Sequence, residues 1–158
     1  MKLSELVVEE AVVADLASQD RDEVIAELID AVIAAGRVDA SLRDQLIGKV
    51  LEREKMSSTG FGRGVAVPHV KHPSISELVA TVGLSQKGVD FNALDKQPVY
   101  SIFLLLSPEN RPEEHLQAME TIFKNLRKDT FRRFLRQATT AEQVMTLLRE
   151  ADDQLLAG

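Results

Sequence analysis

The feature that most constrains this chain is a run of eight residues near its middle, from Val99 to Leu106, that reads Val-Tyr-Ser-Ile-Phe-Leu-Leu-Leu. A strand with one solvent-facing side alternates polar and apolar residues, whereas this run is apolar almost throughout. Such a pattern is typical of a strand that is covered on both faces. Further β-type segments occur at 78–84 and 65–67, and residues 11–14 also suit a short strand. The sequence therefore predicts a small sheet with both faces buried.

Helices are expected before this central part of the sequence. Asp20 followed by Glu23 is a capping-box signal at the start of a helix with apolar residues at helical spacing. Gly36 is suited to the position just after the end of that helix. Asp39 would then open a second helix, which leads into a glycine-rich loop.

Helices are also expected after the central strand. The segment Asn110–Pro112 predicts a helix start, because proline is suited to the first helical turn. A further helix is predicted near Asp129, and Thr139 with Glu142 forms another capping box. Gly88 predicts a turn between two of the strands. Helices at both ends and strands in the middle predict an α/β (α+β) chain in which a sheet is sandwiched between helices.

Composition narrows the classes of function. A length of 158 residues predicts one domain, over residues 1–158, and a formal net charge of −6 with a pI near 5.1 disfavours a nucleic-acid partner. The chain has no cysteine, which excludes disulfides and thiolate chemistry. Acidic residues stand where a signal peptide has its apolar core, and no apolar run approaches the roughly 18 residues of a membrane span. We therefore expect a cytoplasmic protein without direct membrane insertion.

The segment with the strongest chemical signal is Ser58 to Ile75, STGFGRGVAVPHVKHPSI. Its glycines do not suit a dinucleotide fingerprint, because a helix precedes them and β-type residues follow, and a P-loop lacks its Gly-Lys-Ser/Thr. Two interpretations stay open from the residues alone. The glycines either turn the chain, or let backbone N–H groups converge on an oxyanion beside His69.

A metal site is the remaining alternative for the histidines. His69 and His72 stand in H-x-x-H order, and His115 would be a third ligand. Pro73 argues against a helix that would hold the first two on one face, and no acidic residue accompanies them at ligand spacing. We expect neither a metal nor another cofactor.

The segment Arg53 to Lys71, REKMSSTGFGRGVAVPHVK, resembles the active-site region of a known family. That family is the fructose/mannitol-type IIA domains of the bacterial phosphoenolpyruvate-dependent phosphotransferase system (PTS), with the nitrogen-regulatory IIA proteins as its most similar group. The later segments GVDFNALDKQPVYSIFLLLSP and HLQAM also resemble the family, in the same order. The resemblance covers about residues 5–150 and implies a three-layer α/β/α sandwich with a small mixed sheet.

The resemblance also implies residue roles. The phosphorylated histidine falls on His69, which would accept phosphate from the small phosphocarrier HPr or its nitrogen-system paralogue. Arg53 and a second active-site histidine, His115, would assist as a charged fork and a hydrogen-bond donor. From the residues alone, Arg53 suits a solvated charge and His115 a core histidine. The expected phosphate-binding residues lie in the loop and are Ser58, Thr59, Gly60, Gly62 and Gly64.

The family pattern leaves three functions open. We expect a histidine phosphocarrier of the transferase class, of the nitrogen-regulatory kind, with regulated target proteins as further partners. The alternatives are a fructose/mannitol IIA subunit that passes phosphate to a IIB domain, and an interaction module that is not phosphorylated. Val70 is the one departure, because the family typically has glycine after the active histidine. A valine at positive φ would be an outlier, so the backbone there must be extended or the local geometry must differ.

Overall fold

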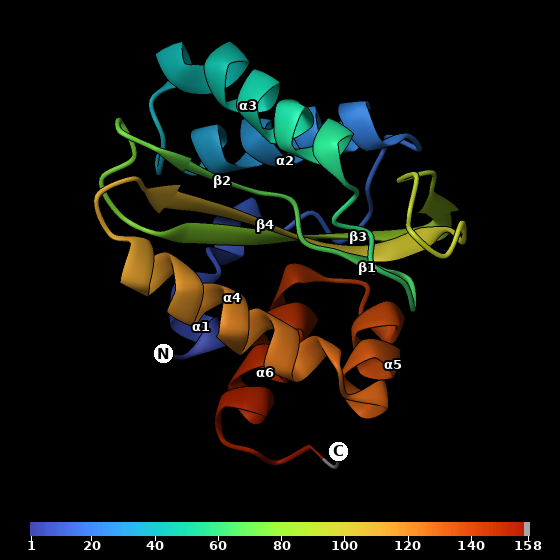
Figure 1. Cartoon of the computed structure of the whole chain (residues 1–158). Coiled ribbons are helices and arrows are strands. Elements are labelled where there is room, and N and C mark those ends of the chain that lie inside the picture. The colour runs from blue at the N-terminus through green and yellow to red at the C-terminus, as the bar shows by residue number, and fades with distance from the viewer. Residues whose placement is uncertain (157–158) are drawn as a thin grey trace.

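The computed structural model describes residues 1–156 and has a single sheet with helices on both faces (Figure 1). The helices are α1 (Leu3–Leu6), α2 (Arg21–Ala34), α3 (Arg43–Met56), α4 (Pro112–Leu126), α5 (Asp129–Gln137) and α6 (Ala141–Asp152), with 3-10 turns at Glu9–Ala11 and Ala40–Leu42. The strands are β1 (Val65–Ala66), β2 (His69–His72), β3 (Val79–Val89) and β4 (Val99–Pro108). The predicted α/β/α sandwich with a mixed sheet is confirmed.

The strand predicted to be buried on both faces, β4, lies at the centre of the sheet. It pairs with β3 in antiparallel fashion on one edge and with both β1 and β2 in parallel on the other. Val65 is opposite Ser101 and His69 is opposite Leu105, so β1 and β2 follow the same register along one edge of β4. Together, β1 and β2 form one edge strand that is interrupted at Val67–Pro68.

The alternation of side chains along the strands divides the core into two layers. Helices α2 and α3 cover one face, and α1, α4, α5 and α6 cover the other (Figure 1). The residues that point toward α4, α5 and α6 include Val65, Val67, Phe103 and Leu105, and those that point toward α2 and α3 include Ala66, Val70, Ile102, Leu104 and Leu106. This parity decides which face each functional side chain occupies, because neighbours in a strand point to opposite sides.

Several local signals act as predicted. The Asp20 side chain accepts a hydrogen bond from the Glu23 amide at 3.0 Å at the start of α2, and Gly36 follows that helix with φ +77°. Asp39 caps the 3-10 turn that precedes α3, and Pro112 opens α4. Local capping and turn chemistry therefore fixes most of the helix ends.

Other local predictions were wrong. Residues 11–14 form no strand, because Val13 makes only a single bridge to Gly83. Gly88 lies inside β3 at φ +93°, where the register with β4 shifts, so it accompanies a bulge and not a turn. The cap of α6 is Thr140, one residue later than predicted, and its hydroxyl accepts from the Gln143 amide at 3.1 Å.

Candidate active site

His69 begins β2 and is fixed by a backbone group two residues earlier. Its Nδ1 lies 2.8 Å from the carbonyl oxygen of Val67. A carbonyl oxygen can only accept, so Nδ1 carries the proton and Nε2 keeps its lone pair. The structure therefore presents His69 in the tautomer whose Nε2 can act as a nucleophile.

Pro68 explains why the Val67 carbonyl serves this purpose. Proline has no N–H, so the parallel ladder between the edge strand and β4 loses a donor at this position. The Val67 amide instead donates to the Thr59 carbonyl at 3.3 Å, and the ladder resumes where the Leu105 amide donates to the Pro68 carbonyl at 3.0 Å. The interruption turns the chain at Val67 and places its carbonyl beside the His69 ring.

His115 reaches the same place from α4. The rings of His69 and His115 are 5.6 Å apart between centroids and are tilted by 51°. Ser107 of β4 belongs to the same sheet face, and its hydroxyl lies 2.7 Å from Nδ1 of the buried His115. The first turn of α4 thus sits over the carboxyl end of β4, next to the start of β2.

Both imidazoles are held neutral at pH 7. Burial lowers the pKa of His69, the hydrogen bond to Val67 partly opposes this, and the charge of Arg53 lowers the pKa further. Burial also lowers the pKa of His115 to about 4, and the proximity of His69 and Lys71 lowers it further because protonated neighbours disfavour a second positive charge. A neutral imidazole is the form that can attack an electrophile or donate from one nitrogen.

Arg53 lies in the last turn of α3 and is half-buried. Its Nη1 donates to the carbonyl oxygen of Ser57 at 2.7 Å, just past the end of the helix. A cation is favourable at this position because the helix carbonyls there carry partial negative charge. The positive charge of Arg53 also contributes to the lowered pKa of His69.

Glu54 is a buried residue of the site that the sequence analysis did not single out. Its carboxylate accepts hydrogen bonds from the amide of Thr59, at 2.9 Å, and from the Thr59 hydroxyl. Because the Thr59 carbonyl in turn accepts from Val67, Glu54 connects α3 to the backbone that orients His69. Within an Arg-Glu-Lys run, nothing in the sequence distinguishes a buried carboxylate from a solvated one.

The predicted phosphate-binding loop is held by its own hydrogen bonds. The Ser58 hydroxyl donates to the Phe91 carbonyl at 3.2 Å and accepts from the Gly60 amide at 3.0 Å. Gly62 and Gly64 have φ values of +121° and +76°, which glycine adopts readily. These observations explain the glycines as turn residues, and a contact between the loop and phosphate stays a prediction.

The structure separates the histidines that an H-x-x-H metal site would need. His69 and His72 are three residues apart on β2, so their side chains point to opposite faces of the sheet. His72 is buried against α3, where its Nε2 contacts the Gln45 side chain and its Nδ1 accepts from the Ser74 amide. Within residues 1–156, no group of three His, Cys, Asp or Glu side chains is placed to hold a metal ion.

Val70 is accommodated by β2. Val70 is extended and pairs with Leu106 of β4, and its φ is not positive. Its side chain packs in the core layer under α2 and α3. Valine after His69 therefore needs no unusual backbone.

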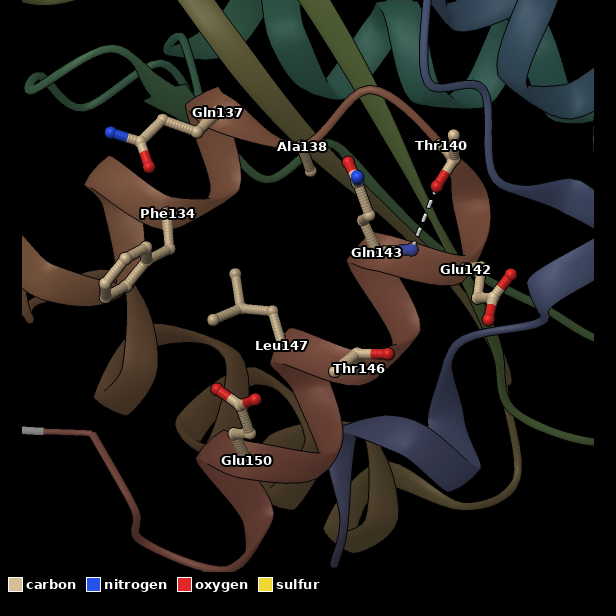
Figure 2. Close-up of a pocket in the computed structure, with 9 residues that line it drawn as sticks. All are labelled: Phe134, Gln137, Ala138, Thr140, Glu142, Gln143, Thr146, Leu147 and Glu150. Carbon is tan, nitrogen blue, oxygen red and sulfur yellow. Dashed lines mark hydrogen bonds between the residues drawn. The ribbon is translucent and has the colours of Figure 1, made fainter.

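One hollow in the structure lies away from these residues. It has a volume of about 710 Å³ and runs between α5 and α6, where Phe134 and Leu147 face each other across it (Figure 2). None of His69, His115 and Arg53 lines it. No helix within residues 1–156 has both the length and the apolar character that crossing a bilayer requires.

Comparison with known proteins identifies the family. The family described as "Phosphoenolpyruvate-dependent sugar phosphotransferase system, EIIA 2" matches residues 5–151. The chain belongs to this family. It is 33% identical to the fructose-specific EIIA component of Haloferax volcanii over 82% of this chain and 83% of that protein. It is 30% identical to the nitrogen regulatory protein of Bradyrhizobium diazoefficiens over 94% of this chain and 95% of that protein.

Other members of the EIIA 2 family differ in length and in sequence. The chain is 29% identical to the fructose-specific EIIABC component of Bacillus subtilis over 96% of its own residues, but it spans only 24% of that protein. Among solved structures, nitrogen regulatory protein IIA-Ntr from Neisseria meningitidis superposes with a TM-score of 0.83 at 28% identity, over 92% of this chain and 98% of that one. Mannitol enzyme IIA of Escherichia coli, solved in complex with phosphorylated enzyme IIB, has the same fold, with a TM-score of 0.74 at 19% identity over 89% and 94%.

Proposed function

We propose that this EIIA-family protein is a histidine phosphocarrier that accepts a phosphoryl group on Nε2 of His69. The observation that carries the proposal is the hydrogen bond from Nδ1 of His69 to the Val67 carbonyl, which leaves Nε2 free. The ring of His115 lies 5.6 Å from that of His69 between centroids, and the charge of Arg53, at the end of α3, contributes to the lowered pKa of His69. Membership of the EIIA 2 family supports the same role.

The transfer step conserves atoms and charge without a general base. The Nε2 lone pair forms a new N–P bond as the N–P bond of a phosphorylated histidine on the donor protein breaks. The donor ring, which is protonated on its other nitrogen, leaves as a neutral imidazole with the electron pair of the broken bond. Nδ1 of His69 keeps its proton throughout, so the His69 ring takes over the positive charge. Phosphoryl transfer depends mainly on positioning and charge stabilisation. Arg53 supplies the positive charge, and Nε2–H of His115 would donate to a phosphoryl oxygen.

The donor is HPr or its nitrogen-system paralogue, and the biological role is regulatory. The structural match to IIA-Ntr at 28% identity and the nearly full coverage of a nitrogen regulatory protein support this role. A fructose-type IIA subunit that passes phosphate to a IIB domain is the second candidate, supported by the 33% identity to a fructose-specific EIIA component. Either role places the protein in the cytoplasm, with its phosphorylated donor.

The test is phosphorylation in a reconstituted system. The purified protein is incubated with phosphoenolpyruvate, enzyme I and HPr, or with their nitrogen-system counterparts, and its intact mass is measured. We expect the gain of one phosphoryl group, stable in base and labile in acid, and no gain in His69→Ala. His72→Ala is the matched control, because it removes a buried histidine from the opposite face of β2 and should still be labelled.

Two outcomes would contradict the proposal. Absence of labelling with both donor systems, while a known IIA protein is labelled, would favour the interaction module. Labelling of His69→Ala would place the phosphorylated residue elsewhere. Addition of a fructose-type IIB domain then separates the two roles, because only a sugar-specific subunit should lose its label to it.

A further inference from the structure

Four arginines gather around one hollow on a chain whose net charge is −6. The hollow has a volume of about 490 Å³ and lies between the glycine loop, the bulged part of β3 and α5. Arg63 comes from the loop, and Arg132, Arg133 and Arg136 come from α5. Asp129 is the one acidic residue in the lining, so the hollow carries an excess of positive charge.

Most of this charge is not neutralised within the protein. Arg132 pairs with Asp129 and also donates to the Leu126 carbonyl at the end of α4. For Arg63, Arg133 and Arg136, no carboxylate oxygen of residues 1–156 lies within 4.0 Å of a guanidinium nitrogen. The charge of Arg63 contributes, after burial, to a lowered pKa of Arg132, so the positive groups are close enough to repel one another.

Two of the guanidinium groups lie over aromatic rings. That of Arg136 is stacked on the ring of Tyr100, with Cζ 3.6 Å from the centroid, and that of Arg133 lies 5.5 Å from the centroid of Phe134. Stacking holds a guanidinium plane while its N–H groups remain available. The ordering cost of binding an anion is correspondingly smaller.

The backbone of Arg63 also indicates a functional side chain. Its φ is +61°, in the left-handed region that glycine and asparagine adopt more easily than arginine does. The turn itself therefore favours a smaller residue. An arginine at this strained position is accounted for if its charge is used.

From these observations we propose that the hollow binds a small anion with two linked phosphate groups, as in a diphosphate ester. Guanidinium groups bind phosphate oxygens in bidentate fashion, and arginines from two segments can engage two adjacent phosphates at once. The volume lies within the range of small-molecule sites. Neither His69 nor His115 lines the hollow, although Arg63 belongs to the same glycine loop that is predicted to bind the transferred phosphate.

The test is calorimetric titration of the full chain with inorganic pyrophosphate at low ionic strength, with inorganic phosphate in a parallel arm. We expect saturable binding of pyrophosphate and at least about tenfold weaker binding of phosphate. Arg63→Asn and Arg136→Gln should each weaken pyrophosphate binding by about tenfold or more. Arg63→Asn should also remain folded, because asparagine suits the left-handed backbone better than arginine does.

Arg37→Asn is the matched control, because it removes the same charge from an exposed position after α2, outside the hollow. It should leave pyrophosphate binding unchanged. Three results would overturn the proposal: no saturable binding to the wild-type protein, equal losses in Arg37→Asn and Arg63→Asn, or binding of polyglutamate without binding of pyrophosphate. The last result would assign the arginines to an acidic protein partner instead.

Discussion

The Val67 carbonyl oxygen lies 2.8 Å from Nδ1 of His69, a residue of the same strand edge only two positions later. Pro68 between them removes the amide that would continue the ladder, so the backbone itself selects the imidazole tautomer. Because the acceptor is a backbone oxygen, a substitution of the Val67 side chain does not remove it. His115, in contrast, is held by the side chain of Ser107, so a substitution can test that contact.

Ser107→Ala should slow phosphoryl transfer and destabilise the protein. The hydroxyl of Ser107 is the hydrogen-bond partner of Nδ1 of the buried His115. Its loss leaves that nitrogen unpaired and should lower the free energy of unfolding by about 1–3 kcal/mol. A Ser107 hydroxyl that donates to Nδ1 also keeps the proton of His115 on Nε2, the nitrogen that the proposed mechanism uses as a donor. Imidazole ¹⁵N chemical shifts should therefore show a mixture of His115 tautomers in the variant.

Ser101→Ala is the control for the Ser107 variant. Both serines lie on β4, but the buried hydroxyl of Ser101 has no hydrogen-bond partner within residues 1–156. Its removal should leave the free energy of unfolding unchanged or raise it, and should leave the transfer rate alone. Equal effects of the two substitutions on rate would exclude a positioning role for Ser107.

Acidification should destabilise the protein through His115. Its pKa is lowered to about 4 in the folded state, whereas an unfolded histidine titrates near 6.5, so between these values the unfolded chain binds more protons. The free energy of unfolding should therefore fall as the pH falls from about 6.5 to about 4, by at most about 3 kcal/mol from this residue. Urea unfolding across this range should show a shallower pH dependence in His115→Gln than in the wild type. Identical slopes would contradict the assignment.

Arg53→Ala should slow phosphorylation of His69 by about a hundredfold, because it removes the positive charge that we propose stabilises the transferred group. Arg53→Lys should recover part of the rate, since lysine restores the charge but not the fork geometry. Lys55→Ala provides the comparison, because Lys55 is an exposed cation in the same helical turn. Single-turnover labelling measures all three, and an equal loss in the Lys55 variant would reduce the effect to overall charge.

Two glycine substitutions should change stability in opposite directions. Gly64→Ala should lower the free energy of unfolding by about 1–2 kcal/mol through its left-handed backbone alone. A β-carbon there would also approach the Tyr100 ring at 3.1 Å. Gly48→Ala should raise the free energy of unfolding by about 0.5–1 kcal/mol, because Gly48 is inside α3 and a β-carbon meets nothing within 4 Å. Urea denaturation measures both, and a stabilised Gly64→Ala would remove the backbone argument.

Much of the fold was predictable because the signals are local. The apolar run at 99–106 identified the central strand, and Asp20, Gly36 and Pro112 marked helix ends through contacts within a few residues. The short strand β2 was missed because two histidines and a lysine in four residues show no apolar pattern. Its strand character comes from pairing with β4, a partner more than thirty positions away.

In the candidate site, the proposed nucleophile His69 was predictable from the sequence. The segment from Arg53 to His69 is continuous, and it resembles the active-site region of a known family. Only the tertiary structure decided which groups surround His69. The alternation of side chains along β2 and β4 directs His69 and Ser107 toward α4 and directs His72 toward α3. His69 therefore lies beside His115, whereas His72 lies on the opposite face of the sheet. The tertiary structure also buries the Glu54 carboxylate, which accepts a hydrogen bond from the Thr59 amide of the loop. It lowers the pKa of His115 by burial, and burial depends on packing that no short segment of sequence specifies.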